Sequence, residues 1–141
     1  MIGLSSEIGG IISRLDKSEI SILKQFGDCI GMAYQVQDDT LELFSDSDSM
    51  NKSLDSDFRL QKKTFLWSSI EAEHRNELEK IISGFSSNKE KTINDLRQFM
   101  INHGVKEKAD LYVANKIDEA NNFLDSLSFD TGFLEYYSKL I

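Results

Sequence analysis

The segment GDCIGMAYQVQDDTLE, residues 27–42, decides how this chain is interpreted, because it sets acidic side chains into an otherwise apolar helical pattern. Helical spacing puts Asp38 and Glu42 one turn apart, with Asp39 about 100° further round and Gln35 one turn earlier. An isolated carboxylate is costly to bury, so such a group usually faces water, a cation or a base. Oxygen ligands gathered in this way suit Mg²⁺, which often takes one or two carboxylates and shares its shell with a phosphate.

Chance offers a second explanation for this acidic cluster. The chain has 141 residues, of which 24 are Asp or Glu. An acidic pair followed three residues later by a third acid is then expected about 0.7 times from composition alone. Taken by itself, the cluster is equally well explained as a solvated acidic face. The surrounding sequence has to separate the two explanations.

The composition favours a single all-α domain with a real core. Hydrophobic residues make up 40% of the chain and charged residues 28%, which is ordinary for a globular protein. There is no proline and there are only 8 glycines, so most helix breakers are absent. We therefore expect a helical bundle of about five to six helices, forming one domain over residues 1–141.

Charge and cysteine content exclude several classes of function. A formal net charge of −8 argues against nucleic acid or an anionic membrane as the main partner. The sequence has no secretory signal pattern and no uncharged stretch of membrane-spanning length, so we expect a cytoplasmic protein without a membrane span. Cys29 is the one cysteine, which rules out an internal disulfide, and its place on a core helix predicts a buried, small apolar side chain.

Apolar periodicity predicts the positions of the helices. A long helix carrying the acidic cluster is expected at residues 18–44, with Ser18 as its N-cap, followed by a polar loop at 45–61. The C-terminal helices are expected within residues 62–140. Outside the long helix, we expect individual helices at residues 2–15, 62–83, 89–102, 106–127 and 131–140. His103-Gly104 is expected to form the C-terminal cap of the helix at 89–102.

Two glycines lie close to the acidic face of the long helix, about two and three turns before Asp38. Gly27 and Gly31 would leave open space along the helix, as the lining of a pocket would need. Close packing of a second helix explains small residues at this spacing equally well. Periodicity alone leaves both interpretations open.

The residues after the cluster separate chance from function. The sequence NKSLDSDFRLQKKT, residues 51–64, follows the acidic helix. Here the chain resembles the trans-prenyl diphosphate synthases, or polyprenyl synthetases. Their second aspartate-rich region has the approximate pattern G-x-x-x-G-x-A-[FY]-Q-[IV]-x-D-D-x-L-D, followed by G-K-x-x-x-[ST]-D-[LF]-x-x-x-K-x-T. Residues 27–42 match the first pattern almost position by position, and the second is matched by Lys52, Ser56, Asp57, Lys62 and Thr64.

The resemblance covers most of the chain and implies the C-terminal half of the isoprenoid synthase fold. It also implies that Asp38 and Asp39 hold Mg²⁺ bridging an allylic diphosphate, with Glu42 a weaker metal ligand in place of the family's third aspartate. Charge stabilisation of a leaving diphosphate is the chemistry that such ligands supply.

The resemblance assigns the remaining matched residues to the diphosphate and to the loop. Lys52 and Lys62 would neutralise the leaving diphosphate, and Gln35 would form a hydrogen bond to it. Without the resemblance, both lysines are better explained as solvated surface. Asp57 and Thr64 have structural or capping roles, Asp57 as a candidate N-cap of the next helix.

Several family features differ or are absent. The loop glycines of the family are Asn51 and Gln61 here, and Leu66 stands where the family has proline. The sequence contains no Asp-Asp-x-x-Asp motif with a following arginine pair, and no upstream basic site for isopentenyl diphosphate. We therefore expect no prenyl transfer by the chain alone.

Three roles fit a chain with only the second motif. It is half of a split synthase, a noncatalytic subunit that regulates a complete synthase, or a decayed copy that persists as a helical dimer. In each case apolar surface left by the missing helices predicts a homodimer, or a hetero-oligomer with a chain that carries the first aspartate-rich motif.

Overall fold

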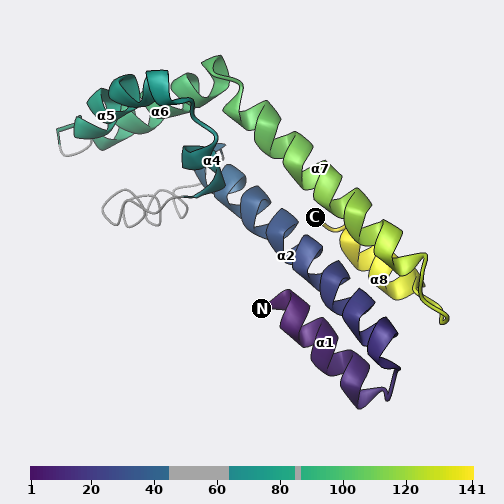
Figure 1. Cartoon of the computed structure of the whole chain (residues 1–141). Helices are drawn as coiled ribbons and strands as arrows, with labels where there is room; N and C mark the ends of the chain where they lie inside the picture. Colours follow the sequence, from purple (N-terminus) through teal and green to yellow (C-terminus); the bar gives the residue numbers. More distant parts are fainter. Residues whose placement is uncertain (45–63, 85–86) are drawn as a thin grey trace. The chain divides into compact units, whose positions relative to one another are not determined.

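The computed structural model describes residues 1–44, 64–84 and 87–141, which form seven α-helices, one 3-10 helix and no strand (Figure 1). The expected all-α fold class is thereby confirmed. In chain order the helices are α1 (Ile2–Ile12), α2 (Lys17–Phe44), α4 (Phe65–Ser68), η1 (Ala72–His74), α5 (Arg75–Ser83), α6 (Lys89–Asn102), α7 (Val105–Leu124) and α8 (Gly132–Ser138). Among the described residues, no helix is both long and apolar enough to span a membrane.

The chain divides into two compact units. Unit 1 contains residues 1–37 and 111–141, and unit 2 contains residues 38–110. The division falls inside α2 and α7, so each of these two helices contributes to both units. The single domain over 1–141 expected from the sequence stays a prediction.

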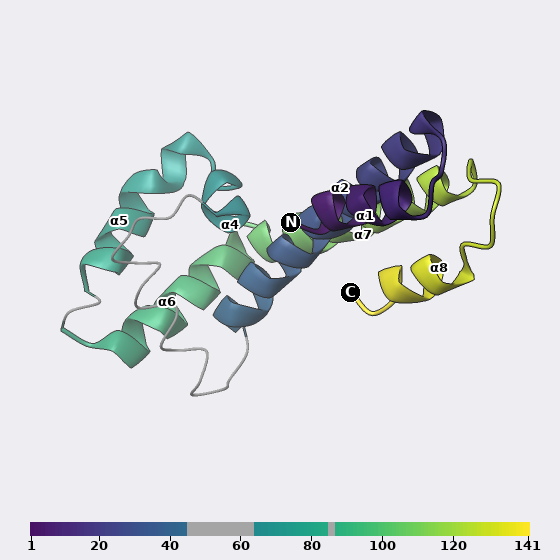
Figure 2. The same cartoon turned by 90° about the horizontal axis from the view of Figure 1, so that it is seen from below.

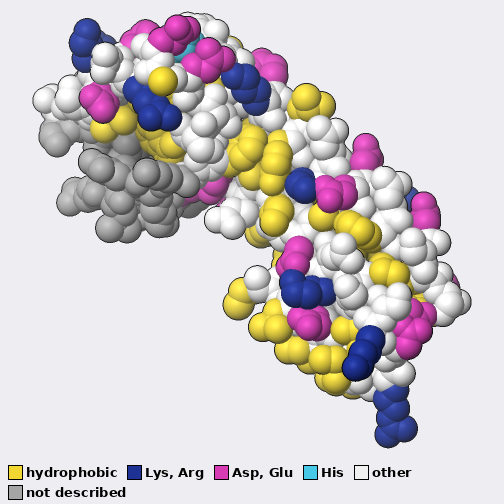
Figure 3. Space-filling model, in the orientation of Figure 1, with side chains coloured by type: hydrophobic (Ala, Val, Ile, Leu, Met, Phe, Trp, Pro, Cys, Tyr) yellow, Lys and Arg dark blue, Asp and Glu magenta, His cyan; other side chains and the backbone are white. Residues whose placement is uncertain are grey.

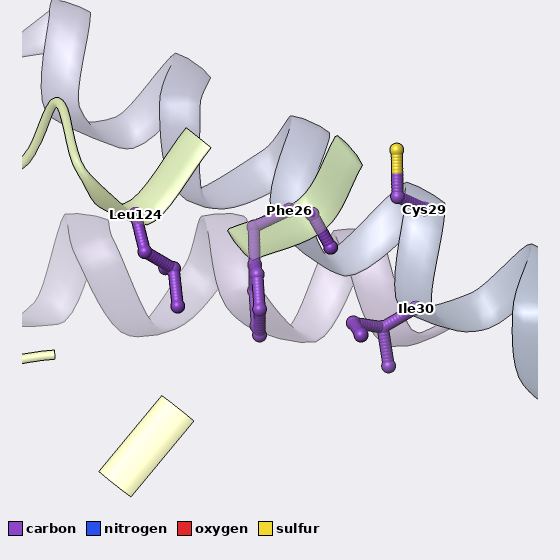
Figure 4. Close-up of a cluster of buried hydrophobic side chains, with 5 residues drawn as sticks. Phe26, Cys29, Ile30 and Leu124 are labelled. Carbon is purple, nitrogen blue, oxygen red and sulfur yellow. The ribbon is translucent and has the colours of Figure 1, made fainter. Parts of the chain in front are cut away.

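The core of unit 1 forms where α2 meets α7. Phe26 and Ile30 of α2 pack with Ala120 and Leu124 of α7, and Figure 4 shows Phe26, Ile30 and Leu124 side by side. Cys29 points to another side of α2 in the same view and is 6% exposed, which confirms its predicted burial. Burial raises the pKa of the Cys29 thiol, which favours its protonated form. Partly buried residues extend this core: Ile2, Phe123, Leu127, Leu134 and Ile141.

Glycines allow α1 to lie directly against α2, alongside which it runs in both views (Figures 1 and 2). A Cβ atom placed on Gly27 would lie 2.8 Å from Cα of Gly3 and 2.5 Å from Oγ of Ser6. A Cβ on Gly10 would lie 3.1 Å from Cγ1 of Ile20. The close approach of the two helices therefore requires glycine at residue 27.

Unit 2 contains the C-terminal end of α2, the helices α4 to α6 and the beginning of α7. α5 packs on α6. The apolar side chains buried in this unit come from all of these helices: Leu43, Leu66, Ile70, Leu78, Ile93, Leu96, Phe99, Met100, Val105 and Ala109.

The predicted helix over 62–83 is wrong as a continuous element. Helix α4 ends after Ser68, and Glu71 adopts an extended conformation with ψ 148° before η1 and α5 begin. The side-chain hydroxyls of Ser68 and Ser69 both donate to the carbonyl of Phe65, at 2.9 and 2.8 Å. Such bonds slightly destabilise a helix but do not by themselves end one, and the apolar spacing that runs through this break gives no sign of it.

The other helices lie where the sequence predicts them, although α1 and α7 each end three residues earlier than expected. The helix over 89–102 is confirmed, with His103 as its C-cap and Gly104 at φ +62°, the left-handed conformation that glycine adopts readily. The long helix begins at Lys17, and the cap is Asp16 in place of the predicted Ser18. Its carboxylate accepts from the backbone N–H groups of Ser18 and Glu19 at 2.8 and 2.9 Å.

A pair of glycine substitutions tests the packing of α1 on α2. We expect Gly27→Ala to destabilise the protein, because the new methyl group collides with the backbone of α1. Overpacking of this kind costs about 1–3 kcal/mol, more than the gain of about 0.5–1 kcal/mol from replacing a helical glycine. Urea unfolding measures the difference.

Gly9→Ala is the matched control, since a Cβ on Gly9 has no atom within 4 Å in its surroundings. The control should gain about 0.5–1 kcal/mol from helix propensity alone. If both alanine variants stabilise the protein equally, the close contact at Gly27 does not exist.

Candidate functional site

The burial of one side of α2 fixes the direction of the acidic cluster. Buried residues recur every three or four positions along this helix: Leu23, Phe26, Ile30, Ala33, Val36, Thr40 and Leu43. At 3.6 residues per turn they form one continuous stripe. Asp38 and Glu42 project from the other side of α2, and Asp39 lies at the flank between the two sides.

The residues predicted to form the site differ in their exposure. Gln35 and Asp38 are exposed, whereas Asp39 and Glu42 are half-buried. All four belong to the single helix α2, so the structure brings them together as the sequence spacing requires. Carboxylates at this depth remain open to water while their orientation is restricted, as suits the ligands of a hydrated cation.

The electrostatics of this end of α2 favour a bound cation. Asp38 and Glu42 carry like charges at i, i+4, which destabilises a helix by about 0.2–0.5 kcal/mol. The cluster also lies near the C-terminus of α2, where the helix dipole is negative, and the last turn contains no basic residue. Positive charge brought to this helix end, by a side chain or by a bound cation, offsets this repulsion.

Two basic residues from other helices of unit 2 stabilise the same helix end. Arg97 of α6 donates from Nε to the carbonyl of Leu43 at 2.6 Å. Nζ of Lys106, at the start of α7, lies 6.0 Å from the ring centroid of Phe44. Sequence reasoning missed both residues, because no local motif connects them with the end of α2. Arg97 satisfies a carbonyl that the helix itself leaves without a partner.

The predicted loop residues of the site are only partly visible. Lys52, Lys62 and Asp57 lie outside the described residues, so their predicted roles stay predictions. Thr64 is the N-cap of α4 by backbone position, with no hydrogen bond from its side chain to the helix. Its carbonyl accepts from the N–H of Ser68 at 3.1 Å.

The two glycines on the acidic side of α2 face α1 within unit 1. At Gly27 the structure supports close helix packing, because α1 fills the adjacent space. At Gly31 an added Cβ would make only ordinary contact, 3.7 Å from Cβ of Ile2. A role in lining a pocket stays a prediction and fits Gly31 better than Gly27.

The donor set at the end of α2 fits Mg²⁺. Asp38, Asp39 and Glu42 offer carboxylate oxygens, which hard divalent cations prefer over nitrogen and sulfur. A single helix cannot surround an ion, so this set supplies one side of a coordination shell. Water and phosphate oxygens, or ligands from another segment, must complete it.

Comparison with known proteins places this sequence in a family. The polyprenyl synthetase family model matches residues 1–100, a span that includes α1, α2 and the acidic cluster. The chain belongs to the polyprenyl synthetase family. The resemblance found in residues 27–64 is thereby confirmed, whereas the use of Asp38-Asp39-x-x-Glu42 as a metal motif stays a prediction.

Archaeal relatives agree with the family assignment. A short chain isoprenyl diphosphate synthase of Methanothermobacter thermautotrophicus is 28% identical over 90% of this chain and 39% of its own length. A geranylgeranyl diphosphate synthase of Saccharolobus solfataricus is 30% identical over 70% of this chain and 30% of its own length. The chain thus spans less than half of these polyprenyl synthetases. No solved structure matches it significantly.

The contact of Arg97 with the end of α2 can be tested by substitution. We expect Arg97→Met to destabilise the protein by about 1–3 kcal/mol, because the helix end loses a hydrogen bond from a charged group while the aliphatic stem is kept. Urea unfolding monitored by circular dichroism gives the free energy. Lys91→Met is the control, since it removes the same charge from an exposed position of α6. Equal stability of the two variants would contradict the contact.

Proposed function

We propose that this chain provides the second aspartate-rich half of a prenyl diphosphate synthase site, for the condensation of an allylic diphosphate with isopentenyl diphosphate. The observation that carries the proposal is the carboxylate group of Asp38, Asp39 and Glu42. It lies near the C-terminal end of a continuous helix, inside the segment that matches the polyprenyl synthetase family. We retain a cytoplasmic location as part of the proposal.

In this proposal each residue has a defined task. Asp38 and Asp39 hold the metal–diphosphate, Glu42 supports them with a longer side chain, and Gln35 donates to a diphosphate oxygen. Lys52 and Lys62 add positive charge to the same group. Bound Mg²⁺ would neutralise the negative charge that develops on the leaving diphosphate.

The other half of the site must come from outside these 141 residues. The sequence contains one acid-acid-x-x-acid motif of this type, and the family uses two that face each other. We propose that a partner chain carries the first motif and the isopentenyl diphosphate site. Family sites lie between facing helices of a bundle, so two chains can assemble one.

Exposed apolar residues on α1 support assembly with a partner. Hydrophobic side chains gather over α1 in Figure 3. Four of its large apolar residues are exposed and recur at helical spacing: Leu4, Ile8, Ile11 and Ile12. Ile12 is 76% exposed. A contiguous apolar helix face of this kind marks an interaction surface. The same surface fits a noncatalytic subunit docked on a complete synthase, which is the second candidate function.

Calorimetric titration tests the proposed binding site. Wild-type protein in Mg²⁺ buffer should bind dimethylallyl diphosphate, and Asp38→Asn/Asp39→Asn should weaken binding about tenfold or more, the effect of losing about 1.4 kcal/mol. Glu79→Gln/Glu90→Gln is the control, since it removes two exposed charges from α5 and α6. Unchanged affinity in the aspartate variant would remove these residues from the site.

A product assay tests the division of the site between two chains. The purified chain with Mg²⁺, farnesyl diphosphate and isopentenyl diphosphate should form no product, because the first motif is absent from it. Adding a chain that carries this motif should restore elongation, and Asp38→Asn/Asp39→Asn should abolish it again. Elongation by the pure chain would contradict the split site, and a complete synthase as the co-purified partner would favour the regulatory role.

A further inference from the structure

The chain contains two histidines, and the fold of unit 2 brings them into contact. His74 ends η1 and stands at the N-cap of α5, while His103 is the C-cap of α6. Their ring centroids are 4.0 Å apart, with an interplanar angle of 41°. The packing of α5 on α6 produces this contact, and no local sequence pattern predicts it.

A carboxylate completes a triad with the two imidazoles. Glu77 lies in the first turn of α5, three residues after His74 and so on the same side of the helix. Its Oε2 lies 3.9 Å from Nε2 of His103. One ligand atom from each of His74, Glu77 and His103 can be chosen so that all lie within 4.8 Å of one another. In Figure 3 a small area of histidine surface is visible among acidic side chains.

The surroundings hold the histidines in place before any ligand binds. The ring of Phe99 packs against His103 with centroids 4.4 Å apart. The backbone N–H of His103 donates to the carbonyl of Phe99 at 3.1 Å, and Gly104 turns the chain immediately afterwards with φ +62°. The side chains of His103 and His74 are 22% and 31% exposed, so both rings are restricted but reachable from solvent.

We propose that His74, Glu77 and His103 form a binding site for a divalent transition-metal ion of the Zn²⁺ class. Two imidazole nitrogens with one carboxylate are a donor set that zinc accepts in proteins, with water in the fourth position. Imidazole suits Zn²⁺, Ni²⁺ and Cu²⁺, whereas Mg²⁺ prefers oxygen ligands. The site therefore differs in chemistry from the acidic cluster of α2.

The spacing of the ligand atoms is compatible with this metal. With metal–ligand distances of about 2.0–2.1 Å, the ligand atoms of a tetrahedral ion lie about 3.4 Å apart. The ligand atoms of the three side chains lie up to 4.8 Å apart, so metal binding requires side-chain movements of about 1 Å. Glu77 has a side chain that is 61% exposed and can make this adjustment by rotation.

The charges around the triad favour a cation. Glu73 places Oε1 3.2 Å from Nε2 of His74, where its carboxylate can bind the metal or hold the ring. Glu71 forms an ion pair with Lys108 at 3.6 Å, so this lysine is directed toward a carboxylate. The negative end of the α6 dipole lies at His103, while the positive end of α5 at His74 opposes it. Together Glu73 and Glu77 leave the immediate surroundings negative.

Zinc titration of the untagged, full-length chain tests the proposal. Wild-type protein should bind about one equivalent of Zn²⁺ at this site by calorimetry. Replacement of Zn²⁺ by Co²⁺ should give the visible absorption of a tetrahedral cobalt complex. His103→Gln and Glu77→Gln should each weaken Zn²⁺ binding about tenfold or more. Glu77→Gln keeps the test valid if the histidine variant unfolds, because residue 77 is largely exposed.

Two controls separate this site from the acidic cluster. Glu90→Gln removes one exposed charge from α6 and should bind Zn²⁺ like the wild type. Asp38→Asn/Asp39→Asn should also retain Zn²⁺ binding, and excess Mg²⁺ should not displace the ion. Wild-type affinity in Glu77→Gln and His103→Gln, or loss of Zn²⁺ binding in the aspartate variant, would overturn the proposal. Absence of Zn²⁺ binding by the wild type would show that the two rings serve packing alone.

Discussion

The buried stripe of α2 is the constraint on which the rest of the structure depends. Phe26, Ile30 and Ala33 are at most 2% exposed, and this stripe continues to Leu43. Burying each large apolar side chain contributes about 1.5–3 kcal/mol, so turning α2 by one residue, about 100°, would expose several of them and bury a carboxylate instead. The rotation of the helix is thus fixed by its core side, and the direction of Asp38 and Glu42 follows from it.

Local patterns carried most of what could be predicted from the sequence. The long helix expected at 18–44 is observed over Lys17–Phe44, and the helix at 89–102 has the predicted bounds, because apolar spacing and caps act within a few residues. The predicted helix over 62–83 is wrong as a continuous element because the apolar spacing runs on through the break between α4 and η1, so local periodicity does not reveal it.

Contacts between distant segments explain what the sequence could not supply. Arg97 reaches the carbonyl of Leu43 across 54 residues of chain, and His74 meets His103 only after α5 has packed on α6. Gly27 shows the same limit in another form. Its spacing fitted both an open pocket and a helix contact, and only the position of α1 favours the contact. The roles of such residues become clear only from tertiary packing, since the adjacent sequence fits more than one role.

The proposed division of the site depends on how the acidic half is held. Asp38, Asp39 and Glu42 take their orientation from α2, whose stripe is buried by residues of this chain and whose Leu43 carbonyl accepts a hydrogen bond from Arg97. No facing helix is needed to fix them. A site whose first half is preorganised loses less conformational entropy when its second half arrives, so assembly from two chains costs less than ordering both halves together.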